Sequence, residues 1–546
     1  MIFVFSVVNT FHHGGTEITE KKQNKMQHLL ALQFTTPDVN LWLIAPELIV
    51  CLAGVVVMLV DAFGRPNQRW ITGSISLAGL VAAAAASIWL WLAWMGPSQA
   101  FNGMIVLDGL RLGFTLVFIL VSALTIFVSM VWVENEKLPA GEFHSLLLFA
   151  TAGMMLMASG GDLVIIFLGL EILSIATYVM AGFRRTDVRS NESSLKYFIL
   201  GSLSSAFLLY GIALIYGATT TAGGLPGTTN IAEIAARISK AQYPPLLFAG
   251  AAMMLVGFGF KIATAPFHIW TPDVYEGAPT PVTAFMAAGP KAAGFASFMR
   301  VFLFGFPFVL ATTDNRVGAD IHATWLNVVS VLAIMTMTVG NVVAIVQNNV
   351  KRMLAYSSIA HAGYALVGFV AAGAAQTAGE RNQAITAVIF YLLTYAVMNI
   401  GGFAVVQLIA RAGDRRTEVE DYNGIGFQTP LLASALSLFL LSLLGMPLTA
   451  GFMGKIMVFS SALDQGYVML VVIGVLNTAV SAYYYLRLII VMFFRERTTM
   501  WMAPQIPASV AFTLILTAAG VLYLGLFPGQ VINALQKEPI VSLTMK

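Results

Sequence analysis

Apolar runs of about 20 residues, separated by short polar connections, recur from residue 41 to residue 528. Runs of that length fit membrane-crossing α-helices, whereas the strands of a β-barrel would leave alternating runs of about 10 residues. The pattern therefore predicts an all-α polytopic membrane protein with about 14 transmembrane helices. The expected spans are 41–62, 71–94, 107–132, 142–158, 162–183, 193–217, 245–270, 279–305, 324–346, 353–373, 383–410, 430–460, 467–494 and 507–528.

Two of these spans contain helix breakers. Span 245–270 includes GFGFKIATAPFHIW, and span 430–460 includes LLGMPLTAGFMGK. Proline removes a backbone hydrogen bond, and in a membrane such a break survives where protein or a hydrated cavity surrounds the freed groups. Because the breaks lie five spans apart, we expect two inverted five-helix repeats, spans 4–8 (142–305) and spans 9–13 (324–494), with broken helices 7 and 12. Helices 1–3 (41–132) precede these repeats, and helix 14 (507–528) follows them.

Residues 1–40 depart from this pattern and are interpreted as an N-terminal extension with no assigned role. The apolar stretch Met1–Val8 is short and follows no basic segment, so it is a poor signal peptide. Met1 and Met26 are both candidate start sites.

Composition limits the chemistry of the chain. Apolar residues make up 58% of the 546 and charged residues 10%, whereas a soluble chain has about 25% charged residues. The net charge of +3 is spread over the connections, which gives no indication of a nucleic-acid partner. The single cysteine, Cys51, excludes an internal disulfide or a thiolate-held iron–sulfur cluster, and the sequence has no P-loop or complete dinucleotide motif. We therefore expect no cofactor or metal in this chain.

Five ionisable residues lie inside predicted spans: Glu171, Lys196, Lys261, Lys291 and Lys455. A charge near the bilayer centre costs roughly 2.5–3.5 kcal/mol on insertion scales, so residues of this kind are functional candidates. Lysine and glutamate can both gain and lose a proton, which indicates a proton path. A structural ion pair is the alternative for Glu171, and a side chain reaching the cytoplasmic interface is the alternative for Lys196. Whether these two residues pair stays open, because helical rise leaves them at different depths.

Other polar residues in or near the spans are weaker candidates. His268 beside the first break and His361 in SSIAHAGYALVG would serve either as proton relays or as packing residues. Glu47 and Asp108 lie near span ends, where we expect interfacial solvation, and Arg111, one turn deeper, is ambiguous. Asp162 begins a span and is expected to cap its helix.

The lysines and arginines of the connections predict the orientation. Odd-numbered connections carry thirteen of them and even-numbered connections five. The odd connections are therefore expected on the cytoplasmic side, with both termini outside.

Four stretches resemble the antiporter-like membrane subunits of proton-pumping NADH:quinone oxidoreductase, respiratory complex I. They are LGLEILSIATYVMAGF, SSLKYFILG, GFGFKIATAPFHIWTPDVYEGAPTPVTAF and GMPLTAGFMGK. The likeness covers roughly residues 40–530. Residues 270–279, followed by a lysine in the next span, look like the subunit N branch rather than the L or M branch.

The resemblance implies a role for each charged position. Glu171 matches the glutamate of the fifth helix, and Lys196 matches the lysine that modulates it. Lys261 matches the central lysine of the seventh helix, and Lys291 matches the connecting lysine of the eighth. Lys455 matches the lysine of the twelfth helix on the exit side. Protons would move outward along this series, driven by electron transfer from NADH to quinone in other subunits.

The same resemblance implies partners and a location. The partners would be subunits K, L and M, smaller membrane subunits, and a peripheral arm with FMN and iron–sulfur clusters. A bacterial inner membrane is the expected location. An Mrp-type sodium/proton antiporter subunit is the alternative function, and a membrane scaffold whose charges only join helices is a third.

Overall fold

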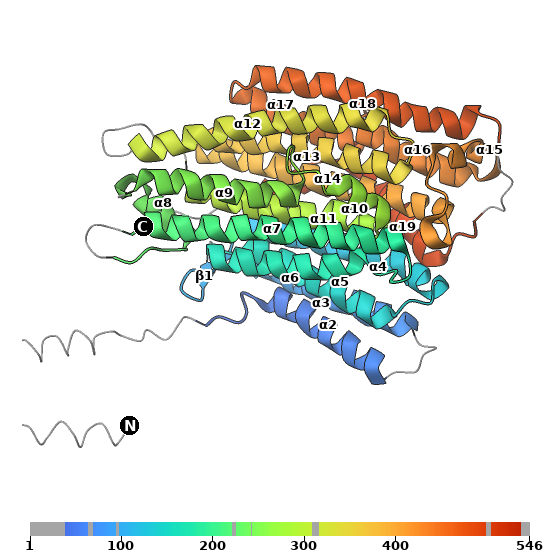
Figure 1. The fold of residues 1–546 in the computed structure, drawn as a ribbon, viewed down its shortest axis with the longest axis horizontal. Coiled ribbons are helices and arrows are strands. Elements are labelled where there is room, and N and C mark those ends of the chain that lie inside the picture. The colour runs from blue at the N-terminus through green and yellow to red at the C-terminus, as the bar shows by residue number, and fades with distance from the viewer. Residues whose placement is uncertain are drawn as a thin grey trace, which may run out of the picture. The chain divides into compact units, whose positions relative to one another are not determined.

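The computed structural model describes residues 39–63, 69–93, 98–220, 225–241, 243–307, 316–497 and 504–536. The predicted extension 1–40 therefore falls almost wholly outside the described residues. From Asn40 onward the chain forms one compact unit. In this unit the helices run side by side, with α8 and β1 at one end and α15 at the other (Figure 1). The prediction of an all-α membrane protein is confirmed, apart from one short β-hairpin.

Twelve of the described helices are long and apolar enough to cross a membrane. They are α2 (Ala45–Phe63), α3 (Arg69–Ala93), α4 (Gly109–Asn135), α5 (Ala140–Ser159), α6 (Leu163–Ala181), α7 (Val188–Ala218), α9 (Pro244–Ile262), α12 (Arg316–Ile345), α13 (Val350–Ala374), α14 (Ala378–Ala410), α18 (Val468–Phe494) and α19 (Ala508–Leu526). The two other predicted spans correspond to α11 (Thr280–Met299) and to the pair α16 (Pro430–Leu444) and α17 (Ala450–Asp464). The count of fourteen crossings and the inverted repeats stay predictions.

Helix α11 lies inside this bundle. Every residue from Thr280 to Met299 is buried, and the helix packs against α4, α5, α6, α9, α13 and α14. Small residues permit this close packing, because a Cβ added at Gly294 would lie 2.7 Å from the Cγ2 atom of Ile262. Helices α2 and α3, in contrast, expose many apolar side chains, as expected of helices that face lipid. A charge on α11 is therefore surrounded by protein rather than by lipid.

Helix breaks occur in both places where the sequence predicts them. Helix α9 ends at Ile262, Ala263 takes the left-handed conformation with φ 61°, and α10 (Thr271–Gly277) begins eight residues later. Helix α16 ends at Leu444, where Gly445 has φ 93°, and α17 begins at Ala450. Glycine adopts this left-handed conformation at little cost, so it ends the helix efficiently.

Short strands and helices lie between the long helices along the chain, and one short helix follows the last of them. Strands β1 (Ser98–Ala100) and β2 (Ile105–Leu107) pair antiparallel, with Ser98 opposite Leu107. The other short elements are α8 (Ile231–Arg237), η2 (Ile238–Lys240), the π-helix η3 (Arg300–Gly305), η4 (Ala412–Asp414), η5 (Val419–Tyr422), α15 (Ile425–Gln428) and α20 (Gly529–Gln536). Asp162 caps α6 as predicted, because its Oδ1 accepts a hydrogen bond of 2.8 Å from the backbone N–H of Val164.

Candidate functional site

Three of the predicted lysines are almost completely buried. Their exposed fractions are 5% for Lys261, 2% for Lys291 and 4% for Lys455. Within the part of the chain that the structure describes, none of the three ammonium groups forms an ion pair, and each donates hydrogen bonds to neutral oxygen atoms. A buried cation without a counter-ion is costly, so this shared arrangement distinguishes the three lysines from structural charges.

Lys261 lies in the last turn of α9, directly before the first helix break. Its Nζ donates to Ser174 Oγ at 2.9 Å and to the hydroxyl of Tyr197 at 3.5 Å. Glu171 lies one turn before Ser174 on α6, and it is close enough for its charge to attract Lys261 without touching it. Its Oε1 atom is buried and accepts no hydrogen bond from any described residue. Glu171 is thus positioned to influence the charge on Lys261 from a short distance.

Lys291 lies on the enclosed helix α11 and reaches toward α13. Its Nζ donates to both the carbonyl oxygen and the side-chain hydroxyl of Ser358. The ammonium also lies 5.5 Å from the centre of the Tyr395 ring, where the negative face of the ring attracts a cation.

Lys455 is held at the second helix break. Its Nζ donates to the carbonyl oxygens of Leu443 at 3.1 Å and Leu444 at 2.9 Å, the last two residues of α16. The C-terminal end of a helix carries partial negative charge, so the break itself supplies the attraction for this lysine. The ring of Tyr364 lies 4.7 Å below the ammonium. The break and the lysine therefore form one local site.

His361 lies within electrostatic reach of both Lys291 and Lys455. It is buried on α13, and its Nδ1 lies 2.6 Å from the hydroxyl of Tyr391, while its Nε2 lies 3.3 Å from that of Tyr485. A ring bonded at both nitrogens to groups that can donate or accept is suitable for passing a proton. This geometry favours the relay interpretation of His361 over simple packing.

His268 does not join this series. It lies half-buried in the broken segment between α9 and α10, and its Nδ1 has no hydrogen-bond partner among the described residues. The structure therefore gives no support to a relay at His268.

Lys196 does not contact Glu171. Its side chain is 42% exposed, and its Nζ lies 2.7 Å from Asp273 Oδ2 and 2.7 Å from Glu192 Oε1. The interpretation of Lys196 as a side chain that reaches the end of the bundle agrees with this arrangement. One of its two partners, Asp273, lies in the stretch 270–279, to which the sequence assigned no role.

Glu47 and Asp108 correct an expectation, because both are buried rather than solvated at the interface. Glu47 accepts from Arg111 at 2.8 Å, and Asp108 pairs with the guanidinium of Arg300. Proximity to a span end did not predict burial, because other helices pack over these residues. All four residues are compensated charges and thus structural.

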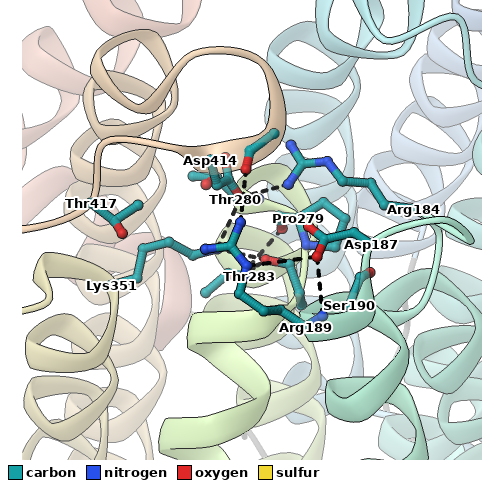
Figure 2. Close-up of polar contacts among 12 residues, drawn as sticks. Arg184, Asp187, Arg189, Ser190, Pro279, Thr280, Thr283, Lys351, Asp414 and Thr417 are labelled. Atoms are coloured by element: carbon teal, nitrogen blue, oxygen red, sulfur yellow. Dashed lines mark hydrogen bonds and ion pairs between the residues drawn. The ribbon is translucent and has the colours of Figure 1, made fainter.

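Asp414 joins four segments of the chain that are distant in the sequence. Its Oδ2 lies 3.0 Å from Lys351 Nζ and 3.0 Å from Arg184 Nη1, and it accepts a 3.1 Å hydrogen bond from the backbone N–H of Thr280. Figure 2 shows Lys351 and Arg184 reaching this carboxylate from different sides. Arg184 also pairs with Glu136 at 2.5 Å. No sequence pattern predicted this cluster, because its charged residues lie in connections that are far apart along the chain.

Burial alone would raise the pKa of Asp414, but the neighbouring charges of Lys351 and Arg184 outweigh burial and lower it to about 2. The carboxylate is therefore permanently ionised at neutral pH. It acts as an anchor for two cations and for the N-terminus of α11 rather than as a proton carrier.

Comparison with known proteins identifies the family of this chain. Residues 160–481 match the family described as NADH:quinone oxidoreductase/Mrp antiporter, TM. A protein of Trichlorobacter lovleyi named NADH-quinone oxidoreductase subunit N is 45% identical over 503 residues, which cover 91% of this chain and 97% of that protein. A relative from Rhizobium meliloti, named NADH-quinone oxidoreductase subunit N 2, is 42% identical over 500 residues, or 91% and 98% of the two chains.

Solved structures show the same fold. A chain of respiratory complex I from Thermus thermophilus with bound aureothin is 34% identical with a TM-score of 0.71, covering 90% of this chain and 99% of that one. A chain of the Mrp complex from Dietzia sp. has a TM-score of 0.76 and covers 92% and 98%, but at 21% identity it shows the fold alone. The chain belongs to the NADH:quinone oxidoreductase/Mrp antiporter membrane family and, within it, to the NADH-quinone oxidoreductase subunit N branch.

Proposed function

We propose that this chain carries protons across the membrane as subunit N of an NADH:quinone oxidoreductase, with Lys261, Lys291 and Lys455 holding the proton in turn. Its apolar helices and bacterial relatives make it a multi-pass protein of a bacterial inner membrane. The other membrane subunits and the peripheral arm of the complex are its partners, and they supply the NADH, FMN, iron–sulfur and quinone chemistry. Among the described residues no group of three or more histidine, cysteine or acidic side chains is arranged to hold a metal.

The observation that carries the proposal is the difference between two kinds of buried cation. Arg111, Arg300 and Lys351 each pair with a carboxylate, which stabilises their charged form at all times. Among the described residues, the three candidate lysines donate hydrogen bonds only to hydroxyl and carbonyl oxygens. A lysine held in this way can release its proton without leaving a partner charge unpaired. Its choice between the charged and the neutral form then depends on charges nearby.

The surroundings of these groups support the order in which the proton would pass. Glu171 acts on Lys261 at one end of the series. Lys291 and Lys455 both lie within electrostatic reach of His361, which supports a relay through this histidine from one lysine to the other. A proton arriving at Lys291 raises the cost of a second positive charge on His361 and Lys455, which favours release from the far end. Electron transfer elsewhere in the complex would bias this series in one direction.

A substitution of Lys261 tests the proposal. The complex with Lys261→Met is reconstituted into vesicles, and protons moved per NADH oxidised are measured. We expect this ratio to fall, or electron transfer to slow with pumping, because methionine fills the site but holds no proton. Lys240→Met removes an exposed lysine and should leave both rates unchanged. Full pumping at an unchanged electron-transfer rate in the Lys261→Met complex would refute the role of this lysine.

The same vesicles separate the proposal from sodium/proton exchange. Pumping that continues in sodium-free buffer supports proton transport driven by electron transfer. A strict requirement for sodium would favour the Mrp-type function instead.

A further inference from the structure

A large cleft lies at one end of the bundle, between the connection of α6 to α7 and the segment that follows α14. Its volume is about 750 Å³. Four arginines but only two carboxylates line it, so positive charge is in excess. We call it the arginine cleft after Arg184, Arg185, Arg189 and Arg415. The three buried lysines of the proposed proton series do not line this cleft, so a ligand bound there has a separate role.

One wall of the arginine cleft is fixed by contacts within the protein. Arg184, which is 6% exposed, donates to the two carboxylate oxygens of Glu136 at 2.5 and 2.6 Å. Glu136 Oε1 also accepts from the backbone N–H of Gly413 at 3.0 Å, and Arg189 Nη2 donates to the carbonyl oxygen of Gly413 at 3.1 Å. Arg184 and Arg189 both extend toward the segment that carries Asp414 (Figure 2). A wall that is held in place before a ligand binds lowers the entropy cost of binding.

The other contacts of the arginines leave much of their charge available for a ligand. Arg185 pairs with Glu142, but the two side chains are 71% and 51% exposed, so solvent weakens this pair. Arg189 is 58% exposed, and its Nε lies 3.6 Å from Asp187 Oδ1, which is too far for a strong hydrogen bond. Among the described residues, no carboxylate pairs with the exposed Arg415. Three guanidinium groups at one cleft are suitable for a phosphate, because each offers paired N–H donors to its oxygen atoms.

An apolar surface leads from this cleft along the outside of the bundle. Val188, the first residue of α7, lines the cleft and is 78% exposed. Farther along α7, Phe198 is exposed, and its ring lies 5.8 Å from that of Tyr178 on α6, where Val179 is exposed too. The step from Val188 to Phe198 is about 15 Å at 1.5 Å per residue, which is about half of the 30 Å thickness of the hydrocarbon core. This surface therefore fits the acyl chains of a single leaflet.

We propose that the arginine cleft binds the phosphate of an anionic phospholipid, whose acyl chains lie along the apolar surface of α6 and α7. The phosphate bridges Arg185, Arg189 and Arg415, and so holds the ends of α6, α7 and α14 together. A free phosphate would use the arginines but leave the apolar surface without a role. The lysines and arginines of the connections predict that this end faces the cytoplasm, the side on which anionic lipids attract basic clusters.

A phosphatidylglycerol with a photoreactive acyl chain tests the site. Purified complex depleted of lipid is titrated with this probe in detergent and illuminated, and the labelled peptides of this chain are identified by mass spectrometry. We expect saturable labelling within residues 179–203. In the double variant Arg185→Gln and Arg415→Gln, the half-saturating concentration should rise at least about ten-fold, because each arginine near an anionic lipid contributes a factor of about five. The matched control, Lys240→Gln and Arg316→Gln, removes two exposed cations outside the cleft and should leave the titration unchanged.

Inorganic phosphate separates a lipid site from a site for soluble anions. It should compete with the probe only weakly, because it does not occupy the apolar surface. Competition by inorganic phosphate as strong as that by unlabelled phosphatidylglycerol overturns the lipid assignment. Equal labelling of the parent and the double variant overturns the role of the arginines.

Chemical modification of the parent complex gives a test that does not depend on the folding of a variant. Phosphatidylglycerol should shield Arg185 and Arg415 from phenylglyoxal, whereas Arg316 should react with or without the lipid. Reaction of all three arginines at the same rate in the presence of the lipid overturns the inference. If Arg185 and Arg415 are already unreactive in the lipid-depleted complex, another subunit covers the cleft, and the inference is equally wrong.

Discussion

Replacing Asp414 by asparagine should destabilise the protein strongly while leaving every candidate proton carrier in place. The substitution removes the only carboxylate among the described residues that pairs with Lys351, which is almost completely buried. Lys351 would keep one strong acceptor, the carbonyl oxygen of Ala278 at 2.6 Å. Arg184 is less affected, because it retains its pair with Glu136. The loss of stability therefore comes mainly from the unpaired charge of Lys351.

Two estimates of the free energy of unfolding that Asp414→Asn would lose are of similar size. Removing one partner of a buried ion pair typically costs about 3–5 kcal/mol, because the other charge is left uncompensated. Independently, the pKa of Asp414 is about 2 in the folded protein, whereas that of an unfolded aspartate is about 3.9, and the difference corresponds to about 2.5 kcal/mol. Because the folded pKa is the lower one, this stabilisation is complete above about pH 4 and is lost as the pH falls toward 2.

The assay must report on this chain within the complex. Purified complex is heated in detergent, and the fraction of the tagged chain that stays soluble is read on a blot. For Asp414→Asn we expect a midpoint lower by roughly 3–8 °C, since the shift per kcal/mol decreases with chain length. Asp320→Asn, which changes an exposed aspartate, should shift the midpoint by less than about 1 °C, as surface substitutions usually do.

A double substitution tests whether the loss of stability comes from the unpaired charge of Lys351. Asp414→Asn combined with Lys351→Met leaves no unpaired ammonium, so the double variant should be more stable than the sum of the two single effects predicts. Strictly additive losses, or a single Asp414→Asn variant as stable as the parent, would show that Lys351 does not depend on this carboxylate.

Two further predictions concern the helix break and a second buried pair. A Cβ at Gly451 would lie 1.8 Å from the carbonyl oxygen of Ser442, so Gly451→Ala should sharply reduce the amount of assembled protein in membranes. A Cβ at Gly379 meets nothing within 4 Å, so the control Gly379→Ala should assemble normally. Arg300→Gln leaves the buried carboxylate of Asp108 uncompensated, which should lower the free energy of unfolding by about 3–5 kcal/mol. The same heating assay should therefore show a lower midpoint, and an unchanged midpoint would mean that water reaches this pair.

Local pattern was sufficient to predict the helices, the breaks and the presence of three lysines inside the helix bundle. Apolar runs, proline and glycine act on neighbouring residues, so the interruptions before α10 and α17 could be read directly from the chain. Lys261, Lys291 and Lys455 stood out because a charge within an apolar run is anomalous wherever the helix finally packs. The cap at Asp162 was equally local.

The pairing of charges was decided only by the tertiary structure. Glu47 meets Arg111 across 64 residues, Asp108 meets Arg300 across 192, and Lys351 meets Asp414 across 63. The sequence also left open whether Lys196 pairs with Glu171, and the structure gave it Asp273 instead. The hydropathy of a segment can be read from that segment alone. The counter-ion of a buried charge, in contrast, depends on which distant helix brings an opposite charge within about 4 Å, the limit of an ion pair. The sequence thus determined which residues carry charge into the membrane, and packing determined which of those charges have a counter-ion among the described residues and which have none.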